Sequence, residues 1–269
     1  MNELLGYGAA IVMGVVLGLM GGGGSILTVP ILVFLFGLTP LAATGASLLI
    51  VGLSSLLGVG AQWRSGTVRL GLALPFALAS VLGVVIMRQW LLPALPEQLW
   101  QQGAFKLTRD GVIMGLFALT MLLAARSMLK PEGPLDEIPD PHGTGKDRWL
   151  SLAGMGLGTG LFSGLVGAGG GFIIVPVLMR WAAMPIKTAI GTSLLIICLQ
   201  SLSGFGADLL RHPRSDWGLL LSFSALAGLG VLLGTGLSRW IPAGRLRPAF
   251  GWFVLVMGLL VLGSTALGH

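Results

Sequence analysis

The sequence predicts an all-helical protein that crosses a membrane several times and is built from two internal repeats. Hydrophobic residues make up 54% of the 269 residues and charged residues only 10%, whereas a soluble domain carries about 25% charged residues. Apolar segments of roughly 17–25 residues, about the length a helix needs to cross the ~30 Å core of a bilayer, follow one another along the chain. Glycine-rich runs at 21–24 and 167–171 occupy the same place in two copies of one pattern.

The apolar segments and the polar stretches between them define the organisation. The segments are, in order, 4–37, 41–62, 70–88, 109–129, 150–182, 186–210, 217–238 and 247–267. The polar stretch 130–148 contains four prolines, a composition that predicts a loop. It separates membrane repeat 1 (1–129) from membrane repeat 2 (149–269). The interruption 93–102 predicts a turn at the membrane surface. Because no basic region precedes the first segment, we expect a retained span rather than a cleaved signal peptide.

The two repeats align without a gap at an offset of 146 residues. Residues 14–61 then face 160–207, and 21 of these 48 positions are identical. Segment 4–37 as one helix would be ~51 Å long, far more than the ~30 Å core. Each glycine costs ~1 kcal/mol in a helix interior, so the run predicts a break followed by a half-helix, Ile26 to Phe36, in copy one and an equivalent break in copy two. Broken backbone at membrane depth must be satisfied by protein or by a water-filled cavity.

Two topologies follow from these breaks. If segment 4–37 crosses once, the repeats run parallel and the 16 Lys and Arg residues split evenly between the two sides. If it enters and returns as a hairpin, the repeats are inverted, and eleven lie on one side against five on the other: Arg88, Lys106, Arg109, Arg211 and Arg214. The positive-inside rule favours inverted repeats with both termini outside.

The glycine breaks are the candidate substrate site. Helix N-termini carry unpaired N–H groups and partial positive charge, and they bind anions; in inverted repeats two half-helices would point at one shared midplane site. The predicted substrate-binding residues here are Gly22, Gly23, Gly24 and Ser25 of copy one, and Gly169, Gly170 and Gly171 of copy two. The alternative is that the glycines only let helices pack closely, as the pairs Gly14/Gly18 and Gly160/Gly164 suggest.

Further polar residues lie in the spans after the breaks. Ser47, Thr192 and Ser193 open these spans and would donate to a substrate oxygen, or alternatively cap a helix. Gln62, Gln200 and Asp208 are candidates for coupling or gating, because polar residues inside a membrane are costly. Asp208 has the alternative of a surface pair with Arg211.

Several function classes are not expected. No catalytic constellation is present, so we expect no enzyme and no catalytic residues. The three histidines and single cysteine have no metal-ligand spacing, so no metal or cofactor is expected. The net charge of +6 comes from residues at span ends, which serve topology, so nucleic acid is not an expected partner.

On these residues the chain resembles the TauE/SafE sulfite exporter family. The motif is Gly14-x3-Gly18-x2-Gly21-x-Gly23-Gly24-Ser25 with Pro30 and Gly45-x-Ser47-Leu48 downstream, and its second copy begins at Gly160 and ends with Gly191-Thr192-Ser193-Leu194. Two positions depart from the family pattern. Ala46 replaces a threonine, and Gln62 stands where members often carry histidine or another polar residue.

The resemblance implies a secondary transporter that exports sulfite or short organosulfonates across a prokaryotic cytoplasmic membrane. Its partners would be a small anionic substrate and membrane lipid. Protons as coupling ion and an oligomeric state stay open, and the exact anion does not follow. The alternatives are an anion channel and a non-transporting membrane scaffold.

Overall fold

A computed structural model describes residues 2–102, 105–129, 146–211, 216–238 and 243–266. The helices of the first half are α1 (Asn2–Met20), η1 (Gly23–Leu27), α2 (Thr28–Phe34), α3 (Pro40–Arg64), α4 (Leu70–Ile86), η2 (Met87–Leu91), α5 (Leu92–Ala94) and α6 (Arg109–Leu129). Those of the second half are α7 (Lys146–Val166), α8 (Gly171–Trp181), α9 (Ile186–Leu209), α10 (Trp217–Leu237) and α11 (Ala243–Ala266). In these ranges six helices are long and apolar enough to cross a membrane, so the polytopic helical class is confirmed.

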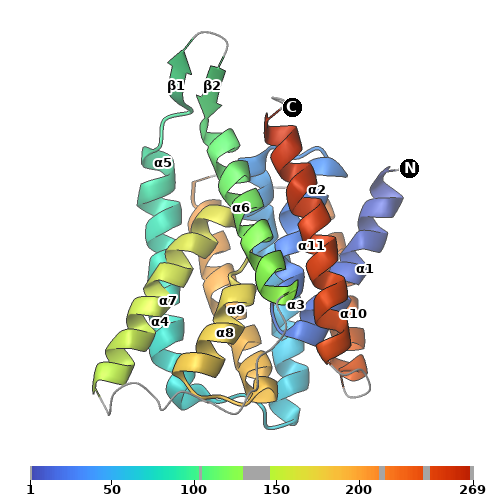
Figure 1. Ribbon diagram of the computed structural model, residues 1–269, viewed down its shortest axis with the longest axis vertical. Coiled ribbons are helices and arrows are strands. Elements are labelled where there is room, and N and C mark those ends of the chain that lie inside the picture. The colour runs from blue at the N-terminus through green and yellow to red at the C-terminus, as the bar shows by residue number, and fades with distance from the viewer. Residues whose placement is uncertain (1, 103–104, 130–145, 212–215, 239–242, 267–269) are drawn as a thin grey trace.

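The region between α4 and α6 is more structured than a turn. A π-helical turn, η2, continues α4, and the short helix α5 follows. The strands β1 (Gln98–Gln102) and β2 (Phe105–Thr108) then pair antiparallel and project from the upper end of the molecule (Figure 1). Residues 130–145 of the predicted linker lie outside the described residues, and α7 begins at Lys146, inside the predicted loop.

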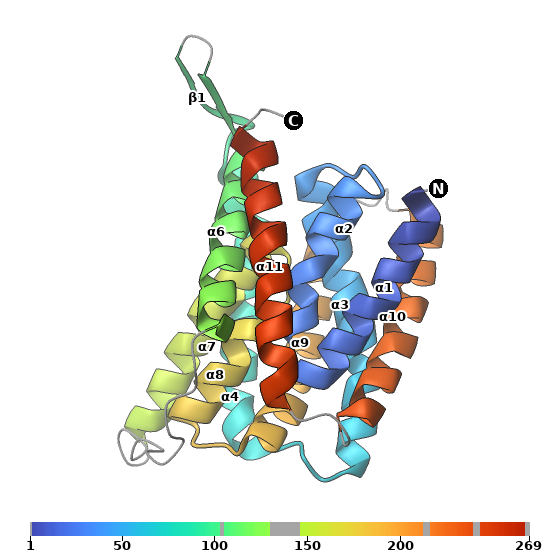
Figure 2. The ribbon, with the colours of Figure 1, turned by 45° about the vertical axis from the view of Figure 1, so that its right-hand side comes forward.

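The two broken segments are hairpins. In Figures 1 and 2, α1 runs downward from the upper end and α2 returns upward, so that α3 begins at the upper end. The second hairpin is reversed, because α7 rises from the lower end, α8 descends and α9 begins at the lower end. Both termini lie in the upper part (Figure 1). This is the chain path that the uneven charge distribution favoured.

Helices α3 and α9 form the centre. Their most apolar windows are 72% and 67% buried, against 39–44% in the other four candidate spans. The helices pack in pairs, α3 with α9, α1 with α10, α4 with α7, and α6 with α11. Each pair joins one helix from each half of the chain. The core is therefore shared between the halves, and neither half encloses a core by itself.

Glycines let the helix backbones approach closely in two of the outer pairs, α1 with α10 and α4 with α7. A Cβ added to Gly14 or Gly18 would overlap the backbone of α10, and one added to Gly160 would overlap the backbone of α4 at Ser80. Small residues let helix backbones approach in this way inside membranes. The packing interpretation of these glycines is therefore confirmed.

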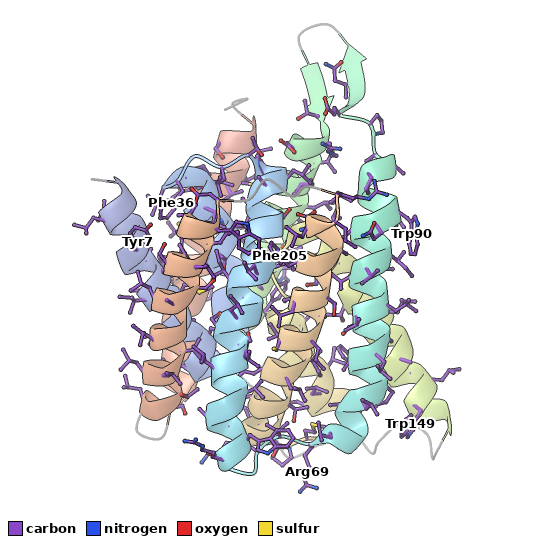
Figure 3. All side chains as sticks on the ribbon, turned by 180° about the vertical axis from the view of Figure 1, so that it is seen from behind. Tyr7, Phe36, Arg69, Trp90, Trp149 and Phe205 are labelled. Atoms are coloured by element: carbon purple, nitrogen blue, oxygen red, sulfur yellow. The ribbon has the colours of Figure 1, made fainter. Side chains whose placement is uncertain are left out.

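Tryptophans lie toward both ends of the molecule. Figure 3 places Trp90 toward the upper end and Trp149 and Arg69 toward the lower end. Tryptophan favours the head-group level of a bilayer, so the tryptophans bracket a membrane-wide band. Large side chains such as Leu78, Leu233 and Leu260 are more than half exposed between these ends, as a lipid-facing surface requires.

Candidate functional site

Each hairpin turns at its glycine run. Gly21, with φ of +69°, ends the path of α1, and Gly167, with φ of +74°, ends that of α7. These values lie in the left-handed region that favours glycine. The first break is shorter than predicted, because Gly23 and Gly24 already belong to the 3-10 helix η1. In the second run Gly169 and Gly170 also have positive φ, and α8 begins at Gly171.

The turns of the two hairpins meet. A Cβ on Gly22 would overlap the backbone of Gly171, and a Cβ on Gly171 would overlap Gly22. Gly21 packs on Ile190 of α9, and Gly167 packs on Thr44 of α3, which is the equivalent position of the other repeat. The structure thus brings both predicted breaks together into one buried contact, here called the glycine junction (21–24 and 167–171).

Two serines from the central helices donate hydrogen bonds to the junction. Ser47 Oγ donates to the carbonyl of Gly167 at 2.5 Å, and Ser193 Oγ donates to the carbonyl of Gly21 at 2.5 Å. Both serines are fully buried. Since 47 and 193, and 21 and 167, are equivalent positions of the repeats, the two bonds form one reciprocal arrangement. Each carbonyl at the end of a broken helix receives the donor it lacks.

The other predicted hydroxyls also have partners. Ser25 Oγ donates to the carbonyl of Gly22 at 2.7 Å. Thr192 Oγ1 accepts from the backbone N–H of Arg69 at 3.1 Å. In this conformation the hydroxyl hydrogens of Ser25 and Ser47 go to backbone carbonyls of the glycine runs, and that of Ser193 is shared between the carbonyls of Gly21 and Ile190. These side chains therefore shape the junction.

Unpartnered polar groups lie beside the junction. Gln200 is fully buried; its Nε2 donates to the carbonyl of Gly169 and lies 3.4 Å from Ser163 Oγ, while its Oε1 has no partner. Ser201 Oγ, 3.2 Å from a Cβ built on Gly169, also lacks a partner. So does Ser55, its equivalent in the first repeat. Buried polar groups without partners are rare and call for a ligand or water.

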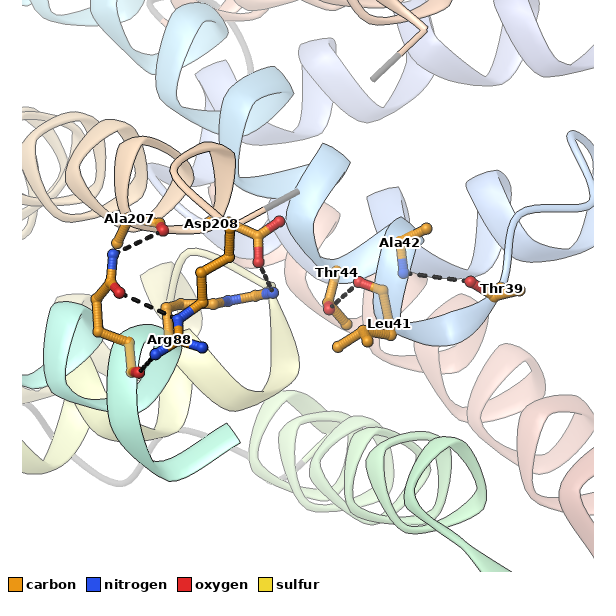
Figure 4. A network of polar contacts seen from close by, with 9 residues as sticks. Thr39, Leu41, Ala42, Thr44, Arg88, Ala207 and Asp208 are labelled. Atoms are coloured by element: carbon orange, nitrogen blue, oxygen red, sulfur yellow. Dashed lines mark hydrogen bonds and ion pairs between the residues drawn. The ribbon is translucent and has the colours of Figure 1, made fainter. Parts of the chain in front are cut away.

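The remaining coupling candidates lie apart. Gln62, near the lower end of α3, accepts from Thr67 Oγ1 at 3.0 Å. Asp208, near the upper end of α9, forms an ion pair with Arg88 at 3.3 Å. Figure 4 shows this pair facing the first turn of α3, where Thr39, Leu41 and Thr44 lie.

Two cavities open beside Asp208. The first, of about 260 Å³, is lined by Leu41, Arg88, Leu92, Pro93, Arg109, Asp208 and Arg211. The second, of about 310 Å³, shares Leu41 and Asp208 with it and extends along Gly45 and Ala46 of α3. From the sequence, Arg88 and Arg109 count only as charges at span ends. The signal that could have singled them out is their position on the side of the membrane where the positive-inside rule predicts few Lys and Arg residues.

The equivalent positions of the two repeats differ in their surroundings. Gly45 faces the cavities, and a Cβ on it would meet Asp208 and come within 3.8 Å of Arg88 Nη1. Gly191, its counterpart near the start of α9, packs instead on Thr67 of the α3–α4 loop, with a built Cβ 2.7 Å from Oγ1. The upper end of the central pair is therefore hollow where the equivalent lower position is filled by a loop.

Among the residues that the structure describes, no three His, Cys, Asp or Glu side chains lie close enough together to hold a metal ion.

Comparison with known proteins gives one consistent result. The sequence model of the family "Sulfite exporter TauE/SafE" matches residues 7–261. A "Probable membrane transporter protein" of Xylella fastidiosa (strain Temecula1) is 30% identical over 95% of this chain and 93% of its own length. Proteins of the same description are 28% identical in Bacillus subtilis (85% of this chain, 86% of theirs) and 26% identical in Methanocaldococcus jannaschii (72% and 69%). No solved structure gives a significant match.

Proposed function

This chain belongs to the sulfite exporter TauE/SafE family of membrane transporters, and we propose that it is a secondary transporter that exports small sulfur-containing anions. Sulfite and short organosulfonates are the proposed substrates, and the cytoplasmic membrane is the proposed place. The two halves act as inverted repeats, and the anion passes the glycine junction, where Gln200, Ser201 and the glycine backbone lie.

One observation carries this proposal: two helix breaks from opposite hairpins meet at a single buried point. Broken helices that meet between repeats are the arrangement that secondary transporters use for substrate sites near the midplane. Ser201 Oγ, which is buried without a partner, supplies a hydroxyl that can donate to an anion at a depth where hydrocarbon offers no donor.

The difference between the two ends supports alternating access. Gly45 borders the two cavities at the upper end, while Gly191 is covered by Thr67 at the lower end. In inverted repeats the two halves can exchange conformations, and the exchange would close the upper cavities and uncover Gly191. The present conformation then faces the upper side, which the charge distribution assigns to the outside.

Counterflow is the experiment that tests the proposal. Purified protein is reconstituted into liposomes loaded with unlabelled sulfite, and uptake of ³⁵S-labelled sulfite is followed under nitrogen. A secondary transporter gives saturable uptake that is accelerated by internal sulfite. A channel gives uptake without counterflow, and a scaffold gives neither, so either result contradicts the proposal.

Variants at the junction test its role. Gly171→Ala places a methyl group against Gly22 and should lower the counterflow rate about fivefold or more, since overpacking of a tight contact costs roughly 1–3 kcal/mol. Gly115→Ala is the matched control, because nothing lies within 4 Å of its built Cβ. Wild-type counterflow in folded Gly171→Ala would remove the junction from the transport route.

A further inference from the structure

We propose that the cavity lined by Arg88, Arg109 and Arg211 is an anion-binding site in its own right, which holds a small oxyanion at the outer mouth of the transport route. The function proposed above places the substrate at the glycine junction and gives these arginines no role. The inference rests on that function only for the direction in which the anion crosses the membrane. The binding itself follows from the side chains.

Arg88 is the strongest indication. It lies in the π-helical turn η2, its side chain is fully buried, and its Nη1 pairs with the carboxylate of Asp208 at 3.3 Å. Its Nε and Nη2 atoms are buried without any hydrogen-bond partner. A buried guanidinium needs its remaining N–H groups satisfied, because desolvation costs more than a single pair returns. Single π-helical turns often occur at functional sites.

The other two arginines are held beside it. Arg211 donates from Nε to Gln89 Oε1 at 3.2 Å and from Nη2 to the Gln89 carbonyl at 2.6 Å. Gln89 in turn donates to the Ala207 carbonyl at 2.8 Å. Arg109, in the first turn of α6, has a buried Nε without a partner. The site is thus assembled from η2, α6 and the turn that follows α9, and protein groups hold Arg88 and Arg211 in place before a ligand arrives.

Charge and size define the ligand class. Three guanidinium groups and one carboxylate line the cavity, so its lining carries a positive excess; Asp110, next to Arg109, is not among the lining residues. Guanidinium groups bind the oxygens of planar carboxylates and tetrahedral phosphates through paired N–H donors. A volume of about 260 Å³ is below the roughly 300–1,000 Å³ of pockets for drug-sized ligands. The fit is an oxyanion of a few heavy atoms, such as sulfite or a short sulfonate.

The position of these arginines in the membrane is also unusual. They are three of the five cationic residues on the side that the positive-inside rule keeps poor in Lys and Arg. The positive-inside rule therefore does not explain why these arginines lie on this side. Their position around one cavity does explain it, because arginines on the outer side raise the local concentration of anions.

The second cavity extends from this site along α3 in the direction of the junction, and its lining residues end before the junction is reached. It begins at the shared residues Leu41 and Asp208 and follows α3 past Gly45 and Ala46. Ser47, which binds the glycine run of the other half, comes directly after. An anion that leaves the junction toward the upper side would therefore meet Asp208 and Arg88 next, and it would compete with the Asp208 carboxylate for Arg88.

Titration of the full-length protein with sodium sulfite tests the site. The protein is held in an uncharged detergent under nitrogen, and binding is measured by calorimetry with sodium chloride at equal ionic strength as reference. We expect Arg88→Gln, Arg109→Gln and Arg211→Gln each to weaken sulfite binding about tenfold to a hundredfold, the range for hydrogen bonds to charged groups. Arg126→Gln, an exposed change at the other end of α6, should bind as wild type.

Two additions keep the test decisive. If Arg88→Gln fails to fold because the buried ion pair with Asp208 is broken, the neutral double variant Arg88→Gln/Asp208→Asn replaces it. Nanodiscs of zwitterionic phosphatidylcholine and of anionic phosphatidylglycerol separate a free anion from an anionic lipid headgroup. Equal sulfite affinity in both supports a free-anion site, whereas loss of sulfite binding in phosphatidylglycerol assigns the cavity to lipid and overturns the inference.

The outcomes separate this inference from the proposed function. Folded arginine variants that bind sulfite as wild type overturn the site, as does a wild type that binds no sulfite. Arginine-dependent binding without any counterflow leaves the site standing and removes the transporter. Normal counterflow with unchanged KM in all three variants removes the site from the route and leaves the transporter.

Discussion

Ser47 and Ser193 illustrate how single residues hold this molecule together. Each donates its hydroxyl hydrogen to a carbonyl in the glycine run of the opposite half, 120 and 172 residues away in the chain. Inside a membrane no water replaces such a partner. The pair therefore links central helix to hairpin twice, once for each repeat.

Removing either hydroxyl should lower stability. We expect Ser47→Ala and Ser193→Ala each to reduce the free energy of unfolding by about 1–3 kcal/mol, because a buried carbonyl loses its donor. Ser55→Ala is the matched control, since its buried Oγ has no partner and its loss should cost little. Thermal unfolding in detergent measures the differences. Equal midpoints for Ser47→Ala and Ser55→Ala would contradict this account.

The sequence predicted the residue types at the junction but not their partners. The repeat placed Ser47 and Ser193 at equivalent positions, which singled them out, yet only the hairpin geometry shows that they bond across the halves. Arg88 escaped notice for a physical reason. Charge counting treats every arginine near a span end as an indicator of topology, and burial of the guanidinium depends on how η2 packs between α7 and α9.

At the scale of helices, hydropathy predicted the spans well because lipid demands continuous apolar helices. The breaks followed from length, since neither 4–37 nor 150–182 fits one crossing. Hydropathy did not predict the β1–β2 hairpin, because it lies outside the apolar segments. It also missed the 3-10 helix η1, in which Gly23 and Gly24 act as helix residues despite their low propensity.

Close packing of helix pairs can be tested within one helix. Gly160→Ala should lower the unfolding free energy by about 1–3 kcal/mol, because the added methyl group would overlap the α4 backbone at Ser80. Gly158→Ala, two residues earlier in α7, meets nothing within 4 Å and should be neutral or stabilising by up to about 1 kcal/mol. Unfolding in detergent compares the two, and equal effects would refute the close contact of α4 with α7.

For the whole molecule, the chain path implies which loops share a side of the membrane. With two reversed hairpins, the α4–α6 connection and the end of α9 lie on one side, and the α3–α4 loop and the start of α9 on the other. Parallel repeats with single crossings would place each of these pairs on opposite sides. From the eleven-to-five charge asymmetry we predict that the first side faces outward.

Cysteine labelling distinguishes these arrangements. In a Cys198→Ala background, Glu97→Cys and Leu210→Cys should react with an impermeant maleimide in intact cells, whereas Ser65→Cys and Lys187→Cys should react only after permeabilisation. All four positions are exposed in the structure. The native chain provides the blank, because Cys198 is buried. Opposite labelling of Glu97→Cys and Leu210→Cys would refute the hairpin path.

The reciprocal serine bonds have a consequence for biosynthesis. When the ribosome has released only the first half, the hairpin turn at Gly21 lacks the hydroxyl of Ser193, and α1 lacks α10 as its neighbour. An unsatisfied carbonyl in lipid is costly, so the turn of the first hairpin gains its hydrogen-bond donor only when α9 has been synthesised and packed beside it.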